Sequence, residues 1–241
     1  GAFIADAAQH GRDKLTVGLA PSFASLGLWN EQLVAESTGK HGKGSLPIVD
    51  EPLGAPDEYG GDRAFVSVAS ESDSADTTRL DALEAAGFPV LRLSIRHENL
   101  GAEFFRWEFA TAVAGAALGI NPFDEPNVSE AKEKTKALLG AYASRGTFDD
   151  VPQQPSSALI RQTIASLRPG DYAAFLSYLP ADSGVKSVLA ETRLRLRKQT
   201  KVASTFGIGP RYLHSTGQYH KGGPNTCVAF VITADDETQT P

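Results

Sequence analysis

The sequence predicts an α/β fold built on a parallel sheet. Short runs rich in β-branched residues alternate along the chain with segments whose apolar residues recur at helical spacing, and this alternation is typical of βαβ units. The chain has 241 residues, of which 41% are hydrophobic, so it can bury a full core. We expect an αβα sandwich over residues 1–146, a linker over 147–154 and a smaller α+β extension over 155–241.

The first segment is expected to contain strands separated by helices. The strand sequences are LTVGLAP, LPIV, AFVSVAS and PVLRLSI, at residues 15–21, 46–49, 64–70 and 89–95. Helical spacing of apolar residues predicts helices at 26–37, 76–86 and 100–118. Gly87 is expected to end the second helix as a C-cap. The third helix is mostly apolar, which indicates burial between the sheet and another domain or subunit.

The second segment follows a polar linker that contains proline. It is expected to contain a helix that ends at residue 167, the strand DYAAFLSYL and a helix over 183–201. Two further strands should flank the loop GPRYLHSTGQYHKGGPNT at 209–226. This loop is too polar to be core, and long loops held by a scaffold often carry function.

The charge distribution bears on the partners of the chain. A formal net charge of -6 argues against a nucleic-acid interface, which needs a clustered basic face. No stretch reaches the ~18 uninterrupted apolar residues of a membrane span. We therefore expect a soluble, cytoplasmic protein that binds neither nucleic acid nor membrane. One dense basic run alternates with leucines and is expected to form a solvated helix face: Arg193, Arg195, Arg197, Lys198 and Lys201.

The cysteine and histidine content bears on disulfides and metals. The single cysteine, Cys227, excludes a disulfide framework, and its apolar surroundings in the sequence predict a buried, unreactive thiol. His214 and His220 are six residues apart in the polar loop and could ligate a metal. However, no acidic or cysteine partner stands at the spacing of known ligand sets, so no metal site is expected.

The run EQLVAESTGKHGKG at 31–44 contains a candidate general base. Gln32 and Glu36 are four residues apart and should share one helix face, with Glu36 near the helix C-terminus beside Gly39. The helix dipole at that end disfavours a carboxylate and tends to raise its pKa, as a general base working near neutrality requires. From spacing alone, an exposed glutamate before a C-cap glycine is the more ordinary interpretation.

The run GINPFDEPNVSEAK at 119–132 combines a turn with a helix start. Asn121 and Pro122 should end the preceding helix, and Asp124 or Asn127 can cap a new one that begins near residue 128. This arrangement would place Glu125 and Lys132 at the mouth of one turn. The simpler alternative makes Lys132 one more surface amine of a highly charged helix.

These motifs resemble those of glucose-6-phosphate isomerases. In that family a glutamine precedes by four residues a glutamate that is followed by Ser, a small polar residue, Gly and Lys, as in AESTGK here. The family also has Phe-Asp-Gln followed seven residues later by a lysine, which here are FDE and Lys132. STGQYH resembles a Gly-Gln-His segment of the family, with Tyr219 inserted before His220. Glu125 stands where most relatives have glutamine.

The resemblance implies a SIS-type (sugar isomerase) αβα sandwich. It implies interconversion of glucose 6-phosphate and fructose 6-phosphate through a cis-enediol, without a metal or organic cofactor. Glu36 would move the proton between C1 and C2, while Lys132 and either His220 or His214 would assist ring opening. The implied substrate-binding residues are Gln32, Lys40, Glu125 and Gln218. We expect Glu36, Lys132 and one histidine to border a common cleft at the carboxyl ends of the parallel strands.

The order of the motifs resembles the isomerase half of bifunctional transaldolase/glucose-6-phosphate isomerases. That resemblance implies upstream sugar-isomerase and transaldolase domains on the same polypeptide, the former with the phosphate-binding Ser/Thr cluster, and it leaves a homodimer open. The absence of methionine and the start at Gly1 also favour a piece of a longer polypeptide. The alternative is a SIS domain that binds sugar phosphate, or only docks on its sister domain, and is inactive by itself.

Overall fold

The computed structural model describes residues 1–70, 73, 76–148, 154–180 and 184–234. Its strands are β1 (Lys14–Leu19), β2 (Leu46–Ile48), β3 (Arg63–Ala69), β4 (Val90–Ser94), β5 (Tyr172–Ser177), β6 (Ala203–Ile208) and β7 (Cys227–Ile232). Its α-helices are α1 (Ala2–Gln9), α2 (Leu26–Thr38), α3 (Thr77–Ala85), α4 (Leu100–Leu118), α5 (Pro126–Arg145), α6 (Ser157–Ala165), α7 (Val185–Thr200) and α8 (Gly217–Gly222).

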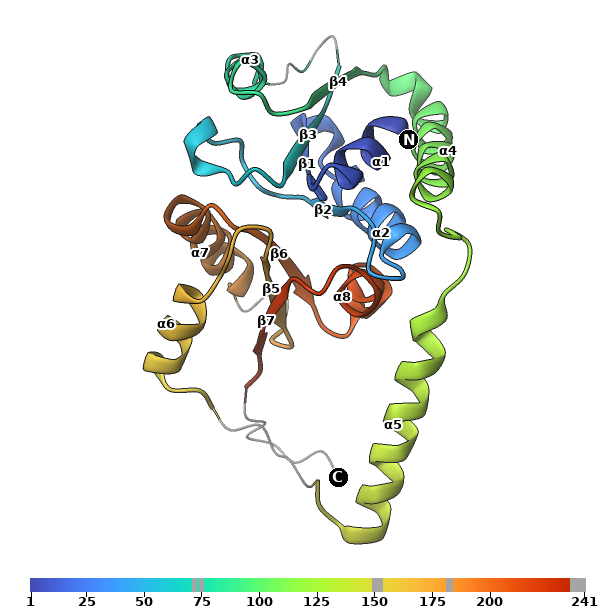
Figure 1. Ribbon diagram of the computed structural model, residues 1–241, viewed down its shortest axis with the longest axis vertical. Helices are drawn as coiled ribbons and strands as arrows, with labels where there is room; N and C mark the ends of the chain where they lie inside the picture. The colour runs from blue at the N-terminus through green and yellow to red at the C-terminus, as the bar shows by residue number, and fades with distance from the viewer. Residues whose placement is uncertain (71–72, 74–75, 149–153, 181–183, 235–241) are drawn as a thin grey trace.

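The strands form two parallel sheets, with the orders β2-β1-β3-β4 and β6-β5-β7 (Figure 1). In the first sheet Leu15 of β1 pairs with Pro47 on one side and Ala64 on the other. The α/β class with parallel sheets is therefore confirmed. The segment 155–241 differs from the expected α+β layout, because α7 and α8 return the chain so that β5, β6 and β7 are all parallel.

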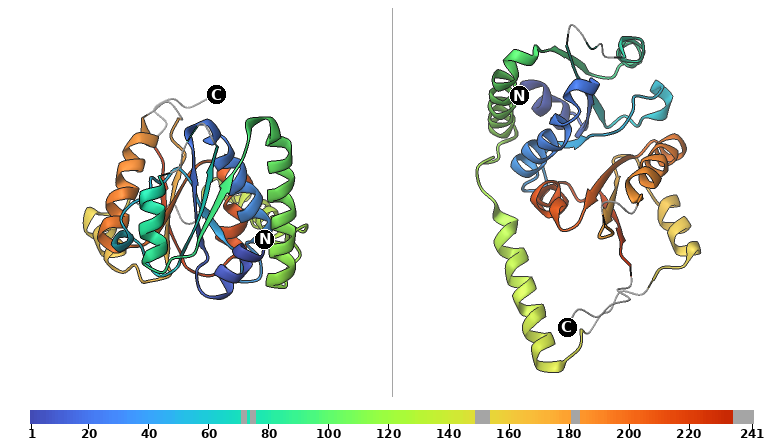
Figure 2. Two further views of the ribbon diagram at one scale, coloured as in Figure 1. Left: turned by 90° about the horizontal axis from the view of Figure 1, so that it is seen from above. Right: turned by 180° about the vertical axis from the view of Figure 1, so that it is seen from behind.

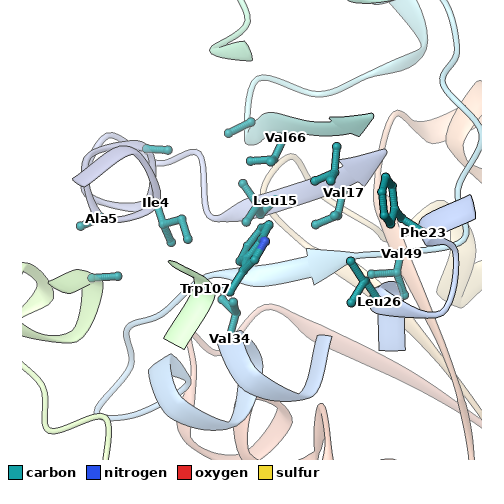
Figure 3. Close-up of a cluster of buried hydrophobic side chains, with 14 of the residues drawn as sticks. Ile4, Ala5, Leu15, Val17, Phe23, Leu26, Val34, Val49, Val66 and Trp107 are labelled. Carbon is teal, nitrogen blue, oxygen red and sulfur yellow. The ribbon is translucent and has the colours of Figure 1, made fainter. Parts of the chain in front are cut away.

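The first sheet is the middle of three layers. Ala64, Val66 and Val68 of β3 pack in one cluster with α1, α2 and α4, whereas Phe65 points to the other face and packs against Leu83 of α3. Seen from above, α4 and α3 accordingly lie on opposite sides of the sheet (Figure 2). The close-up shows Trp107 of α4 in the first cluster, together with residues of β1 and α2 (Figure 3).

Helix α4 spans the expected residues, but only one of its faces is buried. Trp107 is in the core, whereas Phe105 and Phe109 are 67% and 61% exposed and stack on each other with their ring centroids 6.0 Å apart. In this chain the sheet covers the inner face of the helix, and nothing in the described part of the same chain covers the outer face that carries Phe105 and Phe109. No helix in the described ranges is long and apolar enough to cross a membrane.

The two sheets point the same way and share a core. Lys14, at the start of β1, donates a 2.6 Å hydrogen bond to the carbonyl of Gly170, just before β5. Leu46 and Ile48 of β2 pack in one cluster with Tyr172 and residues of the second sheet. The amino ends of both sheets therefore lie on one side of the molecule. Of the expected linker 147–154, residues 149–153 lie outside the described part of the chain.

The basic run of α7 is not the solvated face that we expected. Arg193 and Arg197 are 5% and 2% exposed, although Arg195, Lys198 and Lys201 are exposed. Arg193 and Arg197 are four residues apart, so they share the helix face that packs onto the first segment. Arg197 pairs there with Glu58 at 2.6 Å, and Arg193 donates to the carbonyl of Val49 at 3.0 Å.

Three local expectations also change. Helix α5 begins at Pro126, a favourable first helical residue, with Glu125 at the N-cap position and neither Asp124 nor Asn127 as its cap. The expected loop 209–226 contains a 3₁₀ turn over Arg211–His214 and the short helix α8, which packs against α2. Cys227 is only partly buried, and burial is the main cause of the raised pKa of its thiol.

Candidate functional site

One face of α2 forms the wall of a cavity of about 380 Å³. Trp29, Gln32, Leu33 and Glu36 follow the spacing i, i+3, i+4 and i+7, so they lie on the same side of the helix. The facing wall is the turn between α4 and α5. The full lining is Trp29, Gln32, Leu33, Glu36, Ser37, Pro122, Phe123, Asp124 and Glu125. The cavity thus brings two of the sequence motifs together.

Glu36 is the half-buried carboxylate of this cavity. The Gln32 side-chain amide donates to it at 3.2 Å, so the predicted common face is confirmed. Its pKa is raised, mainly because burial disfavours the charged form, and the charge of Glu125 raises it further. The Gln32 hydrogen bond and the charges of His214 and Lys40 act in the opposite direction. The raised pKa that we expected is present, with burial as its main cause.

Lys40 holds the facing wall in place. Its ammonium group, fully buried, donates to the carbonyls of Asn121, at 2.9 Å, and Asp124, and lies 3.1 Å from the Asp124 carboxylate. Lys40 does not line the cavity. The structure therefore gives Lys40 a positioning contact, and its contact with substrate stays a prediction.

Gln218 also makes a contact between elements. Its side-chain amide donates to the carbonyl of Gly39 at 2.9 Å and to the side chain of Asn127 at 2.8 Å. These bonds connect α8 to the end of α2 and the start of α5. Gln218 is buried and does not line the cavity, and its contact with substrate likewise stays a prediction.

The two histidines of the C-terminal segment lie in different surroundings. His214 is exposed at the end of the 3₁₀ turn, and its charge acts on Glu36. The Nδ1 of His220 lies 2.7 Å from the Tyr172 hydroxyl, and the two rings stack. Burial lowers the pKa of His220 to about 4. His220 therefore contacts β5 through Tyr172, and the choice between the two histidines as the catalytic one stays open.

Lys132 and Glu125 do not share the mouth of one turn. Glu125 lines the cavity at the start of α5. Lys132 is exposed on the same helix and does not line the cavity. It lies six residues after Pro126, the first residue of the helix, which is about 9 Å along the helix axis at a rise of ~1.5 Å per residue. The structure thus brings Gln32, Glu36 and Glu125 together along one cavity and leaves Lys132 outside its lining.

The cavity is not at the carboxyl ends of the strands, so that expectation is wrong. Helix α2 starts after the carboxyl end of β1 and runs back to the amino end of β2, and Glu36 lies in its last turn. A different cavity, of about 510 Å³, lies at the carboxyl ends of β1 and β3. Its lining includes Asp50, Glu51 and Asp76, and it contains none of the predicted site residues.

Sequence reasoning missed the apolar part of the lining. Trp29 and Leu33 share the face of Gln32 and Glu36, and this helical spacing would have identified them. Phe123 is the exposed apolar residue of the facing turn, and the FDE motif already contained it. Among the described residues no group of three or more His, Cys, Asp and Glu side chains could hold a metal ion.

The relatives described here that a comparison with known proteins finds are all glucose-6-phosphate isomerases. No protein-family model matches the chain, and no solved structure matches it significantly. The glucose-6-phosphate isomerase of Leptospira biflexa is 30% identical over 166 residues, which is 53% of this chain and 37% of the relative. That of Rubrobacter xylanophilus is 32% identical over 178 residues, 57% of this chain and 41% of the relative.

A third relative, the glucose-6-phosphate isomerase of Heliobacterium modesticaldum, is 28% identical over 166 residues, or 53% of this chain. The chain spans about two fifths of the length of the curated relatives that it matches. Over about half of its own length the chain is thus similar to glucose-6-phosphate isomerases, and these similarities support that family.

Proposed function

We propose that this chain carries the proton-transfer part of an aldose–ketose isomerase that interconverts glucose 6-phosphate and fructose 6-phosphate through a cis-enediol. The observation that carries the proposal is Glu36, a carboxylate of raised pKa that lines a cavity large enough for a sugar. A general base is most effective when its pKa is near the working pH. The similarity to glucose-6-phosphate isomerases supports the same reaction.

In this proposal Glu36 takes the proton from C2 of the open-chain aldose while O1 gains a proton, which gives the enediol. It then returns a proton to C1 while the O2 hydroxyl loses one, so the ketose forms with no net change in protons. His214 assists opening of the sugar ring, because it is the loop histidine whose charge acts on Glu36. Gln32 and Glu125 bind sugar hydroxyl groups from the cavity wall. Lys132 stabilises charge that develops on oxygen, which requires that α5 or the substrate bring its ammonium group to the cavity. The reaction needs no metal or organic cofactor in this scheme.

Substitution can distinguish the roles of His214 and His220. His214→Asn is expected to lower turnover of cyclic glucose 6-phosphate ~10²-fold, the usual contribution of a positioned acid or base. His220→Asn is expected to lower the melting temperature, because it alters the hydrogen bond between His220 and buried Tyr172. Turnover and thermal unfolding of both variants should be measured side by side. A His220 variant that folds normally but has lost turnover would move the ring-opening role to His220.

We further propose that the chain is the C-terminal part of a bifunctional transaldolase/glucose-6-phosphate isomerase, whose upstream sugar-isomerase domain or second copy supplies the phosphate site. The cavity favours this proposal. Its lining contains the carboxylates of Glu36, Asp124 and Glu125 and no cationic side chain, so it would repel a phosphate group. The same observation favours the alternative that this chain binds or docks without performing chemistry by itself.

A coupled assay with EDTA present distinguishes these functions. The 241-residue chain alone is expected to convert fructose 6-phosphate poorly or not at all, while the complete polypeptide turns it over. Phosphate binding away from the reacting carbons commonly helps to orient them, so its loss should lower kcat. Robust turnover by the chain alone would show that a phosphate site lies within it. A complete polypeptide without turnover, but with sugar-phosphate binding by calorimetry, would favour the binding role.

A further inference from the structure

The short helix α8 carries one side chain that joins the two walls of the candidate cavity. Gln218 is 4% exposed, and its Nε2 donates to the carbonyl of Gly39 at 2.9 Å and to the Oδ1 of Asn127 at 2.8 Å. Gly39 is the C-cap of α2, three residues after Glu36, whereas Asn127 is on α5, two residues after Glu125. A single amide nitrogen therefore bonds to the end of one wall and to the start of the helix that follows the other.

The chemistry of the Gln218 amide matches its two partners. A primary amide has two N–H donors on one nitrogen, and both are used here. The Nδ2 of Asn127 donates to Glu130 at 3.4 Å, which leaves its Oδ1 to accept from Gln218. The Oε1 of Gln218 is buried and has no hydrogen-bond partner in the described part of the chain. Because an unpaired buried acceptor is unfavourable, the two donor bonds are the interactions that favour this amide in the core.

The backbone around this bridge is packed too closely for further side chains. A Cβ atom on Gly39 would overlap the backbone of Tyr219, and one on Gly222 would lie 2.6 Å from both the Gly39 carbonyl oxygen and the Oδ1 of Asn127. Glycine at these two positions therefore lets α8 approach the end of α2 and the start of α5 closely enough for Gln218 to reach both.

Helix α8 is held in place by other contacts, whereas α5 has few. The Tyr219 hydroxyl donates to Asp13, just before β1, at 2.9 Å, and the Nδ1 of His220 lies 2.7 Å from the Tyr172 hydroxyl of β5. By contrast, none of the described residues of α5 is buried, and the helix runs away from the two sheets (Figure 1). The direction of α5 therefore depends on contacts at its start, of which the Asn127 bond is one.

We propose that Gln218 is a positioning residue, which fixes the start of α5 relative to the end of α2 and so sets the separation of Glu125 from Glu36. This role needs no contact between Gln218 and substrate. Its effect on sugar binding rests on the proposed function, in which Glu125 binds a sugar hydroxyl, but its effect on the position of α5 does not. The two effects can therefore be tested separately.

The first test measures the position of α5 in the folded 241-residue chain. Spin labels are attached through Lys136→Cys on α5 and Glu191→Cys on α7, two exposed positions, in a Cys227→Ala background that removes the single native thiol. Double electron–electron resonance then gives the distribution of distances between the two labels. Lys136 lies well beyond the first turn of α5, so a tilt at the start of the helix is amplified there.

Gln218→Met keeps the length of the side chain but removes both donors, so it should shift and widen this distribution. Asn127→Ala should do the same, whereas Asn127→Asp keeps an acceptor for Gln218 and should retain the wild-type distribution. Tyr219→Phe is the matched control, because it removes a hydrogen bond of the same short helix outside the bridge. An unchanged distribution in folded Gln218→Met, or the same change in Tyr219→Phe, would overturn the proposal.

The second test measures turnover by the complete polypeptide. Gln218→Met and Asn127→Ala are expected to raise KM about 10-fold, roughly the effect of one lost hydrogen bond to a carboxylate, with kcat changed only a few-fold. Asn127→Asp should restore KM. The double variant should raise KM no more than Gln218→Met alone, because both changes act through one bridge, and effects that multiply would contradict this. If α5 moves but KM does not change, the positioning role stands and the sugar-binding role of Glu125 is wrong.

Discussion

Replacing Glu36 by glutamine is expected to lower kcat for sugar isomerisation ~10²-fold or more, with KM nearly unchanged. Glutamine keeps the size of the side chain and can still bond to Gln32, but it cannot accept a proton from carbon. The loss therefore falls on the transition state and not on binding. The measurements are a coupled assay on the complete polypeptide and exchange of the C2 proton of glucose 6-phosphate with deuterated water.

Glu125→Gln is the matched control, because it makes the same chemical change in the same cavity. Its charge raises the pKa of Glu36, so its removal should lower that pKa and move the acid limb of the pH–rate profile to lower pH. The maximal rate should change only a few-fold, since Glu125 is assigned to binding. If Glu36→Gln retained near-normal proton exchange, the carboxylate would be only a helix-terminal residue and the proposed role of Glu36 would have to be abandoned.

The strands and most helices of this fold are predictable from local sequence. Each strand coincides, within a few residues, with a β-branched or apolar run, and α2 and α4 follow from apolar spacing. The parallel second sheet was missed because its last crossover contains α8, whose six residues GQYHKG have no helical periodicity. So short a helix is unstable alone and depends on tertiary contacts, here those of buried Gln218 and Tyr219.

In the candidate site, too, contacts within one helix were predictable and contacts between distant segments were not. Local helical spacing predicts that Gln32 and Glu36 share a helix face, and their hydrogen bond confirms it, whereas their choice as site residues came from the family resemblance. The role of Lys40 could not be foreseen, because its acceptors lie 81 and 84 residues further along the chain. His220 likewise bonds to Tyr172, 48 residues earlier. Which buried polar groups form hydrogen bonds with each other depends on the tertiary fold and not on their spacing in the sequence.

The buried charged side chains between the two segments likewise find their partners only through the tertiary fold. Glu51, fully enclosed, lies 3.2 Å from the guanidinium of Arg63 and 3.1 Å from that of Arg197. Arg63 also donates to Thr16 at 2.8 Å, and Arg197 pairs with Glu58. Glu51 thus joins β3 of the first sheet to α7 of the second segment. It is the shared acidic partner of two buried arginines.

Glu51→Gln is accordingly expected to destabilise the folded chain by about 3–5 kcal/mol, the usual cost of removing one partner from a buried ion pair. Glutamine fits the same space but leaves the charge of Arg63 without compensation. Urea unfolding at pH 7 of the 241-residue chain measures the effect. Glu191→Gln, on the exposed face of α7, is the control: it removes a surface pair with Arg195 and should cost at most about 1 kcal/mol.

The pH dependence of stability identifies the charge as the cause. Burial acts to raise the pKa of Glu51, but the charges of Arg63, Arg197 and Arg193 outweigh it, and the pKa is lowered from its usual 4.5. The stabilisation is therefore complete well above pH 4.5 and is lost as the pH falls through the lower, folded-state value. Glu51→Gln lacks this titration, so its deficit in unfolding free energy relative to the wild type should shrink on acidification. A deficit that stays constant from pH 7 into the acid range would mean that altered packing, and not the lost carboxylate charge, destabilises the variant.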